Sequence, residues 1–81
     1  MSERYIATFY SHFGAIRFKR QCDAGGISAK TMPAPRNLSS SCGTCVCCEG
    51  GLPEEFCRDE TEQIVKVQES GYQIIYRAEG S

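Results

Sequence analysis

The sequence has no excess of charge of either sign and no long apolar run. Among its 81 residues, nine are basic and ten are acidic, so the formal net charge is -1. A nucleic-acid-binding surface would show clustered lysine and arginine, and this balance argues against one. No run of about 18 apolar residues is present to span a membrane, and the N-terminus lacks the basic, apolar and small-residue order of a secretory signal. We therefore expect a cytoplasmic protein that binds neither nucleic acid nor membrane.

The sequence also lacks the usual catalytic groups of hydrolases and phosphate-transfer enzymes. It contains no phosphate-binding loop, no serine–histidine–aspartate set and no pair of carboxylates that suggests a catalytic cleft. The single histidine, His12, lies at the expected start of a helix, where a surface or capping role is favoured over ligation or base catalysis. The acidic residues from Glu54 to Glu62 are better explained as the solvated early turns of a helix. A carrier or binding protein is therefore favoured over an enzyme.

A chain of this length is expected to form a single domain, residues 1–81, with a small core to which a partner or homodimer interface would add stability. Apolar and β-branched patterns predict strands at residues 5–10, 27–32, 44–49 and 72–78. A helix is expected between Ser11 and Gly25, and a second helix that starts near Pro53 or Asp59 is expected to end at Gly71. This order, β-α-β-β-α-β, predicts an α+β ferredoxin-like fold, with two helices on one face of a four-stranded antiparallel sheet.

Cysteine, by contrast, is abundant. Four of the six cysteines lie between Cys42 and Cys48, and only Cys22 and Cys57 stand apart. Disulfides within such a cluster would close only short loops, which constrain the unfolded chain least. Reactive or metal-binding thiols in a reducing compartment are therefore favoured over a disulfide framework.

The residues around Cys42 suit a nucleophilic thiol. The two prolines, three serines and a glycine of residues 33–43 predict a loop. Serine hydroxyls and amide groups can converge on a thiolate or persulfide, and a glycine allows a tight turn. Arg36, six positions upstream, would add positive charge that favours the ionised thiol. The residues proposed to stabilise the anion are Arg36, Ser39, Ser40, Ser41 and Gly43. From these residues alone, an ordinary solvated loop with an inert cysteine is an equal alternative.

The other cysteines allow two further interpretations. Cys42 and Cys45 form a Cys-x-x-Cys pair, which suits a carrier thiol with a resolving thiol, a redox dithiol or half of a metal site. On a regular strand, Cys45 and Cys47 would share one face and Cys48 would lie on the other. The candidate ligands of zinc or an iron–sulfur cluster are Cys42, Cys45, Cys47, Cys48 and Cys57, although their spacing matches neither a zinc ribbon nor a ferredoxin.

Three stretches resemble the putative selenium/sulfur carrier protein-like family, a group of small prokaryotic proteins. They are Tyr-Ile-Ala-Thr-Phe-Tyr-Ser-His at residues 5–12, Ala-Gly-Gly-Ile at residues 24–27, and Pro-Arg-Asn-Leu-Ser-Ser-Ser-Cys-Gly at residues 35–43. The resemblance covers almost the whole chain. It implies a small ferredoxin-like domain that carries sulfur or selenium on one cysteine, here Cys42, between donor and acceptor proteins. The chain departs from the family pattern in its additional thiols at positions 45, 47 and 48.

Three hypotheses follow from the sequence. In the first, Cys42 holds a persulfide or selenosulfide, and Cys45 releases it by forming a disulfide with Cys42. In the second, the cysteines bind a metal or cluster. In the third, the chain is a partner-binding module whose exposed sheet face docks on an enzyme.

Overall fold

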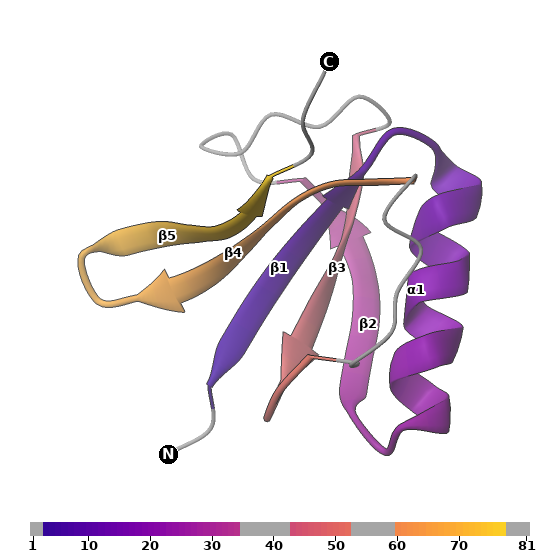
Figure 1. Ribbon diagram of the computed structural model, residues 1–81, viewed down its shortest axis with the longest axis horizontal. Helices are drawn as coiled ribbons and strands as arrows, with labels where there is room; N and C mark the ends of the chain where they lie inside the picture. The colour runs from indigo at the N-terminus through magenta and orange to yellow at the C-terminus, as the bar shows by residue number, and fades with distance from the viewer. Residues whose placement is uncertain (1–2, 35–42, 53–59, 78–81) are drawn as a thin grey trace.

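The computed structural model describes residues 3–34, 43–52 and 60–77, which form one sheet and one helix (Figure 1). All neighbouring strands are antiparallel, and their order across the sheet is β2-β3-β1-β4-β5. The elements in chain order are β1 (Arg4–Phe9), α1 (His12–Ala24), β2 (Ser28–Pro33), β3 (Thr44–Glu49), β4 (Thr61–Gln68) and β5 (Gly71–Arg77). The predicted first helix and the four predicted strands are confirmed to within one residue.

The prediction of a four-stranded, two-helix ferredoxin-like fold is wrong. The sheet has five strands, and the described residues contain one helix, because the chain expected to form the second helix includes β4. Ile64, Val65 and Val67 are β-branched and lose less side-chain freedom in a strand than in a helix. Ile64 and Val65 are buried on opposite faces of the sheet, so the alternation that normally reveals a strand is hidden in the sequence. Gly71, with φ of 136°, lies at the hairpin between β4 and β5 and does not end a helix.

α1 begins and ends where the sequence predicts. The Oγ atom of Ser11 accepts a hydrogen bond from the backbone N–H of Gly14 at 3.2 Å, which satisfies one donor of the first turn. At the other end, the N–H of Ile27 donates to the carbonyl of Cys22 at 2.8 Å, and Gly26 between them has φ of 75°. A glycine in this left-handed conformation ends a helix at low cost. The chain therefore turns directly from α1 into β2.

The main core lies between α1 and the sheet. The helix packs on β1, β2 and β3 (Figure 1). The rings of Phe9 and Phe18 meet in this layer with centroids 5.2 Å apart and planes inclined at 57°, a favourable tilted arrangement. The buried members of this core are Ala7, Phe9, Ala15, Phe18, Cys22, Val46, Cys48 and Ile64. Two cysteines are thus part of the packing that holds the helix on the sheet.

The sheet face turned away from α1, called the far face below, has its own apolar cluster. Its buried members are Ile6, Cys45, Cys47 and Val65, with Met32 and Val67 partly buried against them. No helix from residues 3–34, 43–52 or 60–77 covers this face (Figure 1). The sheet therefore buries apolar side chains on both faces.

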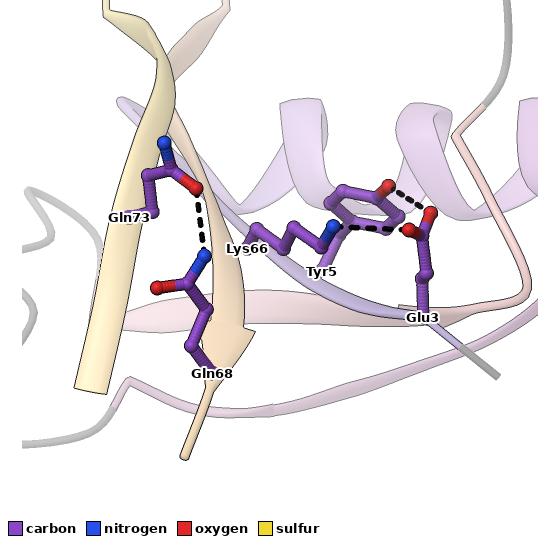
Figure 2. A network of polar contacts seen from close by, with 5 residues as sticks. All are labelled: Glu3, Tyr5, Lys66, Gln68 and Gln73. Carbon is purple, nitrogen blue, oxygen red and sulfur yellow. Dashed lines mark hydrogen bonds and ion pairs between the residues drawn. The ribbon is translucent and has the colours of Figure 1, made fainter. Parts of the chain in front are cut away.

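Exposed polar contacts join β1 to β4 at the start of β1 (Figure 2). The carboxylate of Glu3 accepts a hydrogen bond from the Tyr5 hydroxyl at 2.6 Å and another from the Lys66 ammonium group at 2.9 Å. The hydrogen bond from Tyr5, followed by the one from Lys66, lowers the pKa of Glu3. These groups are solvated, so they orient the strands more than they stabilise the fold. Across the described ranges, no helix is both long enough and apolar enough to cross a membrane.

Candidate functional site

The segment expected to carry the chemistry connects β2 to β3. Arg36, the three serines at positions 39–41 and Cys42 lie outside the described residues, and so does Cys57. Both ends of the connection are described. The N–H of Ala34 donates to the carbonyl of Gly43 at 3.0 Å, and Pro33 pairs with Thr44 across the two strands. The backbone on either side of the Cys42 segment is therefore joined by sheet-like hydrogen bonding.

Gly43, the residue after Cys42, has φ of 72°. This left-handed conformation is one that residues with a side chain adopt at a cost. Among the described residues, no heavy atom lies within 4 Å of the position that a Cβ at Gly43 would occupy. The glycine is therefore needed at this position for its backbone conformation and not for space.

The β2–β3 connection lies at the end of the sheet where β1 leads into α1. Thr8, next to the end of β1, pairs with Cys45, next to the start of β3. The chain then passes from Phe9 at the end of β1 into α1 at His12 (Figure 1). The N-terminal end of a helix carries a partial positive charge that favours nearby anions. The described residues on either side of the Cys42 segment thus lie at the same end of the strands as the N-terminus of α1.

Cys45 is the described thiol closest in sequence to this connection. Its side chain is fully buried on the far face, and its thiol donates a hydrogen bond to the carbonyl of Pro33 at 3.7 Å. Thr8 stands opposite it on β1, and within the described part of the chain the Thr8 hydroxyl oxygen is buried without a hydrogen-bond partner. This arrangement protects the Cys45 thiol from reagents in bulk solvent.

Cys47 lies on the same face, two residues further along β3. Its strand neighbours are Ile6 on β1 and Lys30 on β2. It is 9% exposed and lines a hollow of about 150 Å³ together with Ser28, Ala29, Lys30 and Glu49. Burial raises the pKa of Cys47, and the carboxylate of Glu49 acts in the same direction. Cys47 is therefore a neutral thiol at physiological pH.

Cys47 is expected to react slowly with iodoacetamide at neutral pH and faster as the pH rises above the usual pKa range of a thiol. The reason is that its raised pKa delays formation of the reactive thiolate. Peptide mass spectrometry of alkylation time courses at several pH values measures this. The same protein unfolded in urea is the control, and equal rates for Cys47 in the folded and unfolded protein at neutral pH would contradict the prediction.

Cys48 points to the opposite face, into the core beneath α1, where its sulfur lies 3.5 Å from that of Cys22. The predicted division of the cysteines between the two faces is thus observed. Cys48 cannot ligate the same ion as Cys45 and Cys47, because the sheet separates them. Among the described residues, no group of three or more His, Cys, Asp or Glu side chains could hold a metal ion. Cys42 and Cys57, the remaining candidate ligands, lie outside these residues.

Comparison with known proteins supports the resemblance found in the sequence. The family model described as Putative Se/S carrier protein-like matches residues 4–77. The chain belongs to this family. The match includes the Cys42 segment and all five strands of the sheet. Neither the curated proteins nor the solved structures gave a match.

Two features of this Se/S carrier-like protein were not predicted from its sequence. One is the contact between Cys22 and Cys48, and the other is the buried Thr8 hydroxyl beside Cys45. Helical spacing places Cys22 on the buried face of α1, and strand alternation divides Cys47 from Cys48. Neither pattern shows which face of β3 the helix covers, so the pairing of Cys22 with Cys48 required the tertiary structure.

Proposed function

We propose that this protein carries sulfur or selenium on Cys42, as a persulfide or selenosulfide, between a donor protein and an acceptor protein. The observation that carries the proposal is the match to the Se/S carrier-like family over residues 4–77, which includes Cys42. The hydrogen-bonded ends of the β2–β3 connection support it, because they give the Cys42 segment a fixed attachment to the sheet.

Loading is a thiol exchange at a persulfide. The Cys42 thiolate attacks the outer sulfur of the donor's persulfide, the sulfur–sulfur bond of the donor breaks, and the donor cysteine leaves as a thiolate. A persulfide then stands on Cys42, and no net oxidation has occurred. The reaction needs an ionised attacking thiol. Arg36 and the hydroxyls of Ser39, Ser40 and Ser41 would supply that stabilisation, together with backbone amides near Gly43.

Cys45 is the resolving thiol in this proposal. Its sulfur attacks the Cys42 sulfur, the bond to the outer sulfur breaks, and sulfide leaves with the electron pair. The two cysteines are left as a disulfide, which an external thiol must reduce before the next cycle. Burial of Cys45 supports this role, because a fully buried thiol is not loaded directly by a donor in solution. It lies three residues from Cys42, so the reaction is intramolecular.

The test uses protein prepared without oxygen and incubated with a cysteine desulfurase and L-cysteine. Intact mass spectrometry should show the addition of one sulfur atom, which dithiothreitol removes. Fragmentation of the tryptic peptide that spans residues 37–58 should place that sulfur on Cys42. Metal analysis of the same preparation distinguishes the alternative: a stoichiometric, chelator-resistant metal without a sulfur adduct would overturn the carrier function.

A further inference from the structure

The two cysteines in the helix-side core form a buried thiol pair. The Sγ atoms of Cys22 on α1 and Cys48 on β3 are 3.5 Å apart, and both side chains are fully buried. Each cysteine lies close to the C-terminal end of its element, since α1 ends at Ala24 and β3 ends at Glu49. A bond between the sulfurs would therefore join the end of the helix to the end of a central strand.

The sheet excludes the neighbouring thiols of β3 from this pair. Cys45 and Cys47 lie in the far-face cluster, whereas Cys48 lies in the cluster that contains Cys22. Of the three thiols on β3, only Cys48 therefore faces α1. A bond between the adjacent residues Cys47 and Cys48 would require the strand to be broken, since their side chains point in opposite directions.

We propose that Cys22 and Cys48 form a reversible disulfide by exchange with small-molecule disulfides such as oxidised glutathione. The sulfurs need to approach by only about 1.5 Å to reach the length of a disulfide bond. This modification is separate from the proposed carriage of sulfur, because it uses neither Cys42 nor Cys45.

The exchange has two balanced steps. The Cys22 thiolate attacks one sulfur of oxidised glutathione, whose disulfide breaks and releases one glutathione thiolate. The Cys48 sulfur then attacks the Cys22 sulfur of this mixed disulfide, loses its proton to solvent and displaces the second glutathione. Two protein thiols are oxidised, and one glutathione disulfide is reduced to two thiols. Excess reduced glutathione reverses both steps.

The environment of the two thiols indicates which of them attacks oxidised glutathione first. Either sulfur can donate this hydrogen bond; donation by Cys48 favours the Cys22 thiolate and lowers the pKa of Cys22, and the same hydrogen bond, together with burial, raises the pKa of Cys48. Cys22 therefore ionises first and is the attacking sulfur. It also lies in the last turn of α1, and helix ends open locally at lower cost than the middle of a sheet. Opening of this turn gives the oxidant access to Cys22.

The disulfide would stabilise the fold. It closes a loop from residue 22 to residue 48 in the unfolded chain, which lowers the conformational entropy of that state. The unfolding equilibrium constant is expected to fall by about 30-fold to 900-fold on oxidation, the range that typical disulfides produce.

Differential alkylation tests the pairing in the full-length Cys42→Ser variant, in which the proposed disulfide between residues 42 and 45 cannot form. The protein is oxidised with glutathione disulfide, and its remaining thiols are blocked with N-ethylmaleimide under denaturing conditions. The disulfides are then reduced and labelled with iodoacetamide, and the digested protein is analysed by mass spectrometry. We expect iodoacetamide on Cys22 and Cys48, N-ethylmaleimide on Cys45 and Cys47, and no glutathione adduct in the intact mass of the oxidised protein before reduction. N-ethylmaleimide on Cys22 would overturn the proposal, and so would iodoacetamide on Cys22 together with a cysteine other than Cys48.

A matched pair of variants in the same background provides the control. Cys48→Ala and Cys45→Ala each remove one fully buried sulfur from β3, but on opposite faces of the sheet. Cys48→Ala should stop the exchange at the mixed disulfide, so that the intact mass before reduction shows one glutathione on Cys22, whereas Cys45→Ala should leave the Cys22–Cys48 disulfide intact. Circular dichroism checks that each variant folds. If either variant does not fold, the labelling pattern of the Cys42→Ser protein decides the question without it.

Discussion

Replacing Cys42 with serine is expected to abolish the sulfur adduct formed with a cysteine desulfurase and L-cysteine. A serine hydroxyl is not ionised near neutral pH, so it cannot attack the donor persulfide. Intact mass spectrometry should show the adduct falling below about one-hundredth of the wild-type amount, because the thiol that attacks the donor persulfide is lost. A reductant-labile adduct of wild-type yield on Cys42→Ser would show that another thiol is the carrier.

Cys47→Ser is the matched control for this variant. It makes the same chemical change in the same cluster, but at a position on the far face, in the middle of β3. Burial raises the pKa of Cys47, which makes it a poor nucleophile at neutral pH. Loading of Cys47→Ser should therefore equal that of the wild type. Cys45→Ser should also load, but it should release less sulfide, because the resolving thiol is absent.

Replacing Phe18 with alanine is expected to destabilise the protein by about 3–5 kcal/mol, the usual cost of removing a buried phenylalanine ring. Phe18 is 1% exposed and packs against Phe9 in a tilted arrangement in the core between α1 and the sheet. A domain of this size has a total stability of roughly 4–12 kcal/mol. The variant should therefore be close to unfolded, or unfold at a much lower urea concentration. Equilibrium urea denaturation followed by circular dichroism measures the change.

Phe13→Ala is the control for the core prediction, since it makes the same substitution on the same helix. Phe13 is 61% exposed, and its ring contacts the guanidinium group of Arg17, 5.7 Å from the ring centroid. Its loss should change stability by about 1 kcal/mol or less, the value of an exposed cation–π contact. Similar losses for Phe13→Ala and Phe18→Ala would mean that α1 does not pack on the sheet through Phe18.

The sheet divides the thiol cluster that is so prominent in the sequence into separate environments. Cys45 and Cys47 share the far face, Cys48 joins Cys22 beneath α1, and Cys42 belongs to the connection that precedes β3. This division supports distinct roles for these thiols. In our proposals, Cys42 and Cys45 carry and release sulfur, and Cys22 and Cys48 respond to the redox state of the surroundings.

The helix and the flanking strands could be predicted from the sequence because their signals are local. A serine cap and a glycine end define α1, and alternating or β-branched residues define β1, β2 and β3. β4 was missed, because the helix start signals near Pro53 and Asp59 and the stop signal at Gly71 favoured a helix, while burial of Ile64 on one face and Val65 on the other hides the alternation of a strand. Two-sided burial removes the alternation on which the assignment of a strand depends.

The sequence by itself determined that Cys45 and Cys47 share one face of a strand and that Cys48 lies on the other, because strand alternation is a property of the backbone. It also showed the family, which the match of the family model to residues 4–77 confirms. Only the tertiary structure decided that α1 covers the Cys48 face and that Cys22 meets Cys48 there, 3.5 Å away. The physical reason is that the packing of the helix depends on long-range strand order, β2-β3-β1-β4-β5, which local sequence patterns do not encode.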